Sequence, residues 1–257
     1  MSRVKELFEK EKPAIGTWVT IQNCDVVEAL STLPFDWFVF DWEHSPADIS
    51  TLQTLLPGIR GTNITPFVRV PWNAMVRIKR VLDIGLEGIL VPYVNSKEEA
   101  KNAVKACRYP PNGVRGVGPR RATMYGSRDI VDYFHEFEEE DLIVGVLVET
   151  QKALNNLDEI LAVEGIELAF VGPYDLSANL KIFGQFEHPK FKNAIQRVLN
   201  VCEEVSVTPG IYTRSAKKAK VWIENGFRFV SISSDYLVLR KAYSNALKGL
   251  RDSLDEK

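Results

Sequence analysis

Two carboxylates stand at the ends of neighbouring predicted strands. Residues 142–177 read as a buried strand, LIVGVLVET, then a helical run, QKALNNLDEILAVEG, and then a second buried strand, LAFVGPYDLS. Glu149 closes the first strand and Asp175 closes the second. In a parallel βαβ unit both strand ends lie at the same edge of the sheet, where α/β proteins place their chemistry. We therefore expect the two acids to share one small space.

Two ionised carboxylates that lie close together repel each other. The arrangement therefore calls for a hard divalent cation or for a shared proton. The alternative is that Glu149 and Asp175 merely cap the helices that follow them, as acids near helix starts often do. Spacing alone leaves both interpretations open.

The rest of the chain repeats the same strand and helix rhythm. An opening helix at 4–9 and a last amphipathic helix at 237–250 bracket a regular alternation, with no low-complexity linker between the units. Eight alternating units predict a (β/α)8 (TIM) barrel in a single domain, 1–257, with a doubly wound sheet as the alternative. Besides the two strands above, strands are expected at 15–23, 35–42, 65–71, 88–94, 208–213 and 227–235.

A barrel would pool the polar residues at its strand ends into one site. Acids would hold a cation, an arginine would bind a carboxylate or an oxyanion, and a histidine would move protons. Asp41 would orient the imidazole of His44; the less favoured alternative is that His44 bonds only the local backbone. For Asp83, late in the third barrel helix, a structural role is favoured over a catalytic one. The pool comprises Asp41, Glu43, His44, Arg69, Glu149 and Asp175, with Arg115, Arg120 and Arg121 in a nearby Gly- and Pro-rich loop.

Composition excludes several classes of protein. The net charge of -2 and the pI near 6.0 give no bulk basic character, so neither nucleic acid nor a membrane surface is an implied partner. No run approaches the roughly 18 apolar residues of a membrane span. The three cysteines, Cys24, Cys107 and Cys202, lack metal-like spacing and suggest reduced thiols in a cytoplasmic protein. No predicted strand contains a lysine, so a Schiff-base mechanism has no evident nucleophile.

Several motifs together resemble those of the HpcH/HpaI aldolase family, the class II pyruvate aldolases of the phosphoenolpyruvate/pyruvate superfamily. This family includes the 4-hydroxy-2-oxoheptanedioate, 2-dehydro-3-deoxygalactarate and 2-keto-3-deoxy-L-rhamnonate aldolases. The similarity extends over about residues 15–235. The motifs that carry it are FDWFVFDWEH, TPFVRVP, VLDIGLEGILVPYV, YPPNGVRGVG, VGVLVETQKALNNLDEILAVEGIE and FVGPYDLS.

The resemblance implies a lyase that reversibly cleaves a 4-hydroxy-2-oxo acid into pyruvate and an aldehyde through a metal-bound pyruvate enolate. It implies that Glu149 and Asp175 hold Mg²⁺, Mn²⁺ or Co²⁺, and that His44, paired with Asp41, is the acid and base. Arg69 would contact the bound oxo acid, and Asp83 would lie near a neighbouring subunit's site. Other expected substrate contacts are Gly172, Pro173, Tyr174, Trp18 and Trp42, the two tryptophans being equally compatible with the core, as are Ile211 and Tyr212.

The resemblance also implies a homo-oligomer, a hexamer built as a trimer of dimers, in which the last helix is exchanged between protomers. Two residues depart from the family pattern, since Trp42 and Tyr174 stand where smaller side chains are usual. Two alternatives therefore stay open. One is a lyase of the same superfamily acting on CoA thioesters such as malyl- or citramalyl-CoA, with the loop arginines along a nucleotide groove. The other is a non-catalytic oxo-acid binder.

Overall fold

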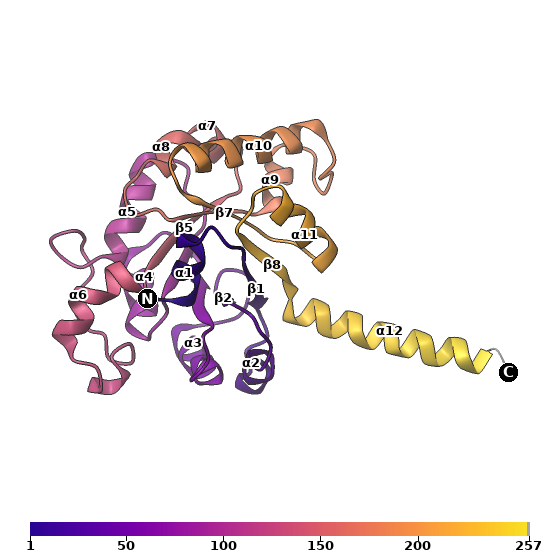
Figure 1. The fold of residues 1–257 in the computed structure, drawn as a ribbon, viewed down its shortest axis with the longest axis horizontal. Helices are drawn as coiled ribbons and strands as arrows, with labels where there is room; N and C mark the ends of the chain where they lie inside the picture. The colour runs from indigo at the N-terminus through magenta and orange to yellow at the C-terminus, as the bar shows by residue number, and fades with distance from the viewer. Residues whose placement is uncertain (256–257) are drawn as a thin grey trace.

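The computed structural model describes residues 1–255 and contains eight parallel strands that close into a barrel in the order β1 to β8. Helices surround the strands on the outside (Figure 1). The predicted (β/α)8 barrel is thus confirmed. The strands are β1 (Ala14–Val19), β2 (Trp37–Asp41), β3 (Thr65–Arg69), β4 (Gly88–Val91), β5 (Ile143–Val148), β6 (Leu168–Val171), β7 (Thr208–Ile211) and β8 (Phe229–Ser234).

Each strand is followed by at least one helix, as the rhythm of the sequence predicts. One difference lies between β5 and β6, where a single crossover helix was expected but two short helices meet at Asn156. The helices are α1 (Arg3–Glu9), α2 (Cys24–Ser31), α3 (Ile49–Leu55), η1 (Leu56–Ile59), α4 (Met75–Asp83), α5 (Lys97–Cys107), η2 (Met124–Gly126), α6 (Ile130–Glu140), α7 (Gln151–Asn155), α8 (Leu157–Leu161), α9 (Pro173–Asn179), α10 (Pro189–Glu204), α11 (Ala216–Glu224) and α12 (Asp235–Asp255).

The interior of the barrel is filled by side chains from alternate strand positions, because successive residues of a strand point to opposite faces. Large aromatic rings are accommodated by glycines on the neighbouring strands. A Cβ on Gly16 would lie 2.1 Å from the ring of Trp37, and one on Gly88 would lie 2.0 Å from the ring of Phe67. The interior cluster comprises Ala14, Trp18, Trp37, Val39, Phe67, Leu90, Ile143, Leu147, Leu168, Phe170 and Phe229, closed at the amino end by Val4 and Leu7 of α1.

The opposite faces of the strands pack against the helices in a second, larger apolar cluster. The helices begin where side chains can accept hydrogen bonds from their free N–H groups. Asn23 caps α2, Ser96 caps α5 and Ser215 caps α11. These three caps fix where α2, α5 and α11 begin.

The same alternation that fills the barrel aims polar side chains into its mouth. Along β2 the inward positions are Trp37, Val39 and then Asp41, and along β5 they lead through Leu147 to Glu149. Arg69 pairs in register with Asp41 across β2 and β3. The carboxyl ends of the strands therefore carry the polar groups, and the amino ends carry the apolar ones.

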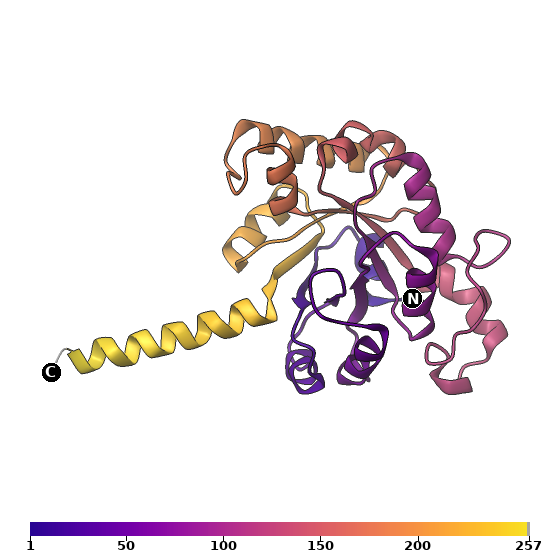
Figure 2. The same cartoon turned by 180° about the vertical axis from the view of Figure 1, so that it is seen from behind.

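The last helix, α12, leaves the barrel and extends away from it, as both views show (Figures 1 and 2). Asp235, its first residue, is buried and accepts hydrogen bonds from the backbone of Thr20 and Ile21. Beyond it the helix exposes an apolar series: Tyr236, Val238, Leu239, Tyr243, Leu247, Leu250 and Leu254. Exchange of this helix between protomers stays a prediction. No helix within residues 1–255 is both long enough and apolar enough to cross a membrane.

Candidate active site

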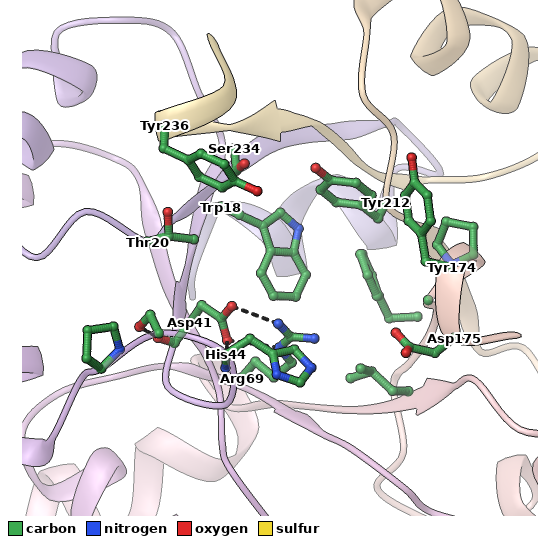
Figure 3. Close-up of a pocket in the computed structure, with 16 residues that line it drawn as sticks. Trp18, Thr20, Asp41, His44, Arg69, Tyr174, Asp175, Tyr212, Ser234 and Tyr236 are labelled. Carbon is green, nitrogen blue, oxygen red and sulfur yellow. Dashed lines mark hydrogen bonds and ion pairs between the residues drawn. The ribbon is translucent and has the colours of Figure 1, made fainter. Parts of the chain in front are cut away.

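A cavity of about 470 Å³ opens at the carboxyl end of the barrel (Figure 3). Its wall brings together residues that are far apart in the sequence, from Trp18 in β1 to Tyr236 in α12. The acids Asp41 and Asp175 flank it with His44 and Arg69, while the hydroxyl side chains of Tyr212, Ser234 and Tyr236 lie across from them. The lining residues are Trp18, Thr20, Asp41, His44, Ser45, Pro46, Arg69, Leu147, Phe170, Gly172, Pro173, Tyr174, Asp175, Tyr212, Ser234 and Tyr236.

Arg69 is fixed by two acids on one side of the cavity. Its Nε donates to Asp41 Oδ1 at 3.0 Å and its Nη2 donates to Asp41 Oδ2 at 2.7 Å. Glu43 Oε2 lies 3.3 Å from the same Nε, and the guanidinium lies 4.6 Å from the centre of the Trp18 ring. Burial alone would lower the pKa of Arg69, but the carboxylates of Asp41 and Glu43 outweigh it and raise the pKa. The guanidinium is therefore a permanent, preorganised cation.

His44 is not oriented by Asp41 as expected from their spacing. Asp41 Oδ1 accepts hydrogen bonds from the backbone N–H groups of Glu43 and His44, and the rest of its carboxylate is engaged by Arg69. The imidazole of His44 is 64% exposed, with Nε2 3.9 Å from Glu43 Oε2. Asp41 thus shapes the turn that carries His44, and the imidazole is free to face a ligand.

Glu149 and Asp175 lie around Gly172. A Cβ on Gly172 would lie 3.6 Å from Glu149 Oε2 and 3.8 Å from Asp175 Oδ2. Glu149 Oε1 accepts the N–H of Tyr93 at 2.8 Å. A Cβ here would be in ordinary van der Waals contact with both acids, so the two carboxylates lie near each other around this residue.

Capping does not account for these two acids. Thr150, not Glu149, caps α7, and no side chain caps α9, in whose first turn Asp175 lies. Burial raises the pKa of Glu149 to about 7, and the negative charges of Glu43 and Asp175 add to this effect. Burial also raises the pKa of Glu43. Negative charge is thus concentrated at this wall, and two of its acids, Glu43 and Glu149, have a raised pKa.

A cation would relieve this repulsion, and the donor set consists of the hard oxygen ligands that Mg²⁺ and Mn²⁺ prefer. Within residues 1–255, no three His, Cys, Asp or Glu side chains are arranged to enclose an ion. The pair Glu149 and Asp175 would therefore supply only part of a coordination sphere. The rest would be left for substrate and water, as in an open catalytic site.

Some residues expected at the site lie outside the cavity. Trp42 follows Asp41 and so points to the other face of the strand, where its ring lies 5.6 Å from the guanidinium of Arg77. Asp83 accepts a hydrogen bond from Arg115 at 2.9 Å and does not line the cavity. Cys107 and Cys202 are buried, and burial raises the pKa of each thiol to about 12, consistent with structural thiols.

Four polar lining residues were not among the predicted site residues: Thr20, Ser45, Ser234 and Tyr236. Ser234 ends β8, so the rule that strand ends carry the site would have found it. Tyr236 lies in the first turn of the exposed helix α12, and no sequence signal points to it.

Comparison with known proteins decides the family, because a profile described as HpcH/HpaI aldolase/citrate lyase matches residues 14–242. The chain belongs to the HpcH/HpaI aldolase/citrate lyase family. It is 39% identical over 242 residues to a 5-keto-4-deoxy-D-glucarate aldolase of Shigella boydii, covering 94% of this chain and 93% of that protein. The family predicted from the motifs is thus confirmed.

Solved structures of HpcH/HpaI proteins share the fold. A family member from Burkholderia cenocepacia has a TM-score of 0.92 at 30% identity, covering 98% of this chain and 100% of the other. An HpcH/HpaI aldolase from Desulfitobacterium hafniense has a TM-score of 0.90 at 29% identity, covering 96% of each chain. Since the relatives are named as aldolases, which are carbon–carbon lyases, the predicted enzyme class agrees with them.

Proposed function

We propose that this protein is a class II aldolase that reversibly cleaves a 4-hydroxy-2-oxo acid into pyruvate and an aldehyde. The observation that carries the proposal is the pair of buried Glu149 and exposed Asp175 around Gly172, with Asp175 and Gly172 lining the same cavity as the fixed cation Arg69. This pairing suits a small anion with a keto group, because pyruvate offers oxygens both to a metal and to a guanidinium.

Glu149 and Asp175 would hold a divalent ion, for which Mg²⁺, Mn²⁺ and Co²⁺ are the candidates. When bound, the ion acts as a Lewis acid on the 2-oxo group and stabilises negative charge as the carbon–carbon bond breaks. The small residue Gly172 beside both acids and the raised pKa of Glu149 both support this assignment.

Arg69 would bind an oxygen of the oxo acid. Two of its nitrogens are bonded to Asp41, while Nη1 donates to no side chain or backbone group among the described residues. A ligand oxygen would thus meet a guanidinium already locked in orientation, which avoids the cost of ordering a long side chain.

His44 would move the proton. In cleavage the C4 hydroxyl loses its proton to the imidazole, the C4–O bond becomes the carbonyl of the aldehyde, and the electron pair of the C3–C4 bond moves to C3 to give the enolate of pyruvate. A proton then returns to C3. In the reverse direction the imidazolium protonates the new alkoxide. The exposure of His44 at the cavity wall supports a group that exchanges protons with ligand or water.

The CoA-lyase alternative gains no support from the geometry, and the binder alternative keeps only Tyr174, which lines the cavity. A CoA groove was expected from the loop arginines, but Arg115 is buried against Asp83 and Arg121 donates to the carbonyl of Ile84. None of the loop arginines lines the cavity described above. Trp42, one of the two bulky residues thought to block turnover, points away from it.

We also propose that the protein assembles through α12, as a homo-oligomer in which this helix packs on another copy. The apolar series along α12 is exposed in the single chain. A contiguous exposed apolar surface of this kind usually marks a site of protein–protein contact. Light scattering on Leu247→Asp should give a smaller assembly than the wild type. Lys248→Asp, on the same turn, is the control and should leave the mass unchanged.

Exchange of the C3 protons of pyruvate into heavy water, followed by NMR, tests the function directly. Exchange is expected with Mg²⁺ or Mn²⁺ and should stop with excess chelator. His44→Ala should slow both exchange and cleavage. A folded protein that exchanges no protons with either metal would overturn the proposal.

A further inference from the structure

A second cavity of about 470 Å³ lies between the first turns of α11 and α12. The strand β8 leads into α12, with α11 beside the strand (Figure 1). Ser233 lines this second cavity while its neighbour Ser234 lines the active-site cavity, because successive residues at the end of a strand point in different directions. This α11–α12 cavity is lined by none of the residues assigned to the aldolase reaction.

The lining of the α11–α12 cavity is positively charged. It contains three cations, Arg214, Arg240 and Lys241, and no acid. None of the three forms an ion pair with an acid among the described residues. Leu237, Arg240, Lys241 and Ser244 follow one another at i, i+3, i+4 and i+7, so a single face of α12 presents both of its cations to the cavity. Unpaired positive charge is thus gathered around one space.

Uncharged donors complete the lining. The residue Ser233 is only 5% exposed, and its hydroxyl forms no hydrogen bond with another described residue. At the start of α11, the side chain of Ser215 accepts from the N–H of Lys218, while the N–H of Ala216 has no partner within the described chain. A largely buried hydroxyl without a partner costs free energy, and a helix start favours negative charge. Both features therefore indicate a ligand with acceptor oxygens.

We propose that the α11–α12 cavity binds a tetrahedral oxyanion of the phosphate class. Three cations suit a doubly negative ligand, and the hydroxyl and N–H donors suit one with several acceptor oxygens. Residues 211–250 contain eight Lys and Arg against two Asp and Glu, in a chain whose net charge is -2. In (β/α)8 barrels, the loops after the seventh and eighth strands and a nearby helix start often bind phosphate. Arg214 Nη1 also donates to the hydroxyl of Tyr174 at 3.1 Å, so the oxyanion shares this arginine with the wall of the active-site cavity.

Calorimetric titration of the full-length, assembled protein with inorganic phosphate tests the proposal. Excess chelator removes any metal ion that would hold phosphate at Glu149 and Asp175, and KCl keeps the ionic strength constant. Phosphate should bind with an affinity at least about 10-fold above that of acetate, a planar ion with a single charge. Equal affinity for the two anions, or no binding of phosphate, would overturn the proposal.

A phosphate monoester distinguishes the two sources of this group. If glycerol 3-phosphate displaces phosphate and binds more tightly, the ligand is a phosphorylated metabolite, and if it binds more weakly, the ligand is the free ion. Either order supports a phosphate site. Pyruvate proton exchange is measured separately, so failure of the aldolase function would not count against this site.

Variants place the bound phosphate. Arg240→Gln combined with Lys241→Gln should lower the phosphate affinity by about 10-fold or more. Ser233→Gly should lower it by a smaller factor, and glycine suits the backbone at this position, where φ is 59°. Lys248→Gln, an exposed cation of α12 that lines neither cavity, is the matched control and should keep the wild-type affinity.

Light scattering on the same samples shows whether the double variant keeps the wild-type mass. If its mass changes, Ser233→Gly alone decides, because that substitution leaves the surface of α12 intact. Wild-type phosphate affinity in Ser233→Gly, or in a double variant of unchanged mass, would show that phosphate binds elsewhere and the proposal is wrong.

Discussion

The two ends of the barrel are made by the same eight strands but differ in how completely their groups are satisfied. At the amino end, Trp37 stacks on Phe229 with ring centres 3.9 Å apart, and Phe67 packs 5.0 Å from Phe229. At the carboxyl end, acids lie together and the polar atoms of Trp18 and Ser234 have no partners among residues 1–255. The contrast separates a stabilising end from an end that keeps binding groups available for a ligand.

The largest effect is expected at the carboxyl end, from Glu149→Gln. The amide keeps the shape of the side chain and its bond from Tyr93 but removes the charge that a cation needs. Losing a residue that only hydrogen-bonds a metal ligand lowers metal affinity by up to about 100-fold. Losing a ligand itself should therefore lower the affinity by more than this, and the rate of pyruvate proton exchange should fall with it. Calorimetric titration with Mn²⁺ measures the metal affinity, and NMR measures the pyruvate proton exchange.

The matched control for that change is Glu159→Gln, an exposed residue of α8. It should leave metal binding and exchange unchanged. Because burial opposes the charge of Glu149, the metal-free Glu149→Gln protein should be at least as stable to heat as the wild type at neutral pH. If Glu149→Gln binds Mn²⁺ with the affinity of the wild type, Glu149 is not a metal ligand.

At the amino end the expected effect is on stability instead. Phe229→Ala removes the ring that contacts Trp37, Phe67, Phe170 and Phe8, and should lower the free energy of unfolding by about 3–5 kcal/mol. Urea denaturation measures the loss. Phe183→Ala, whose residue is 68% exposed, should cost little. Metal affinity per folded molecule should stay near that of the wild type, and a large drop would show that the two ends are not independent.

A pH-dependent effect tests the comparison further, because the amino end also contains a buried acid with a raised pKa. Burial, with the charge of Asp141, raises the pKa of Glu87 from 4.5 to about 8. The protonated form is thus favoured by folding, so this contribution is complete below about pH 4.5 and is lost as the pH rises through 8. Over that window the free energy of unfolding should fall by up to about 1.4 kcal/mol per pH unit.

Glu87→Gln should flatten this dependence, as measured by thermal melts from pH 5 to pH 9. The pH dependence that Glu87 causes should persist in Glu149→Gln, since Glu87 and Glu149 lie at opposite ends of the barrel. If the wild-type melting temperature does not change across this range, folding does not raise the pKa of Glu87 as described.

Most of the fold could be predicted from the sequence because its signals are local. Buried strands with β-branched and aromatic residues alternate with capped amphipathic helices, and eight repeats of that pattern allow few other architectures. The site was partly predictable for the same reason: Glu149, Arg69 and Asp41 all lie at strand ends. The single helix expected between β5 and β6 was wrong in detail, since Asn156 divides it.

The sequence alone determined the barrel, the acids at its mouth and the family. Only the tertiary structure decided which groups meet: that Arg69 rather than His44 engages Asp41, that Trp42 faces away, and that Arg214 reaches Tyr174. The physical reason is that periodicity fixes the face on which a side chain lies, whereas closing the barrel brings together strands that are distant in the chain. Contacts across the mouth depend on that closure, and no local pattern encodes them.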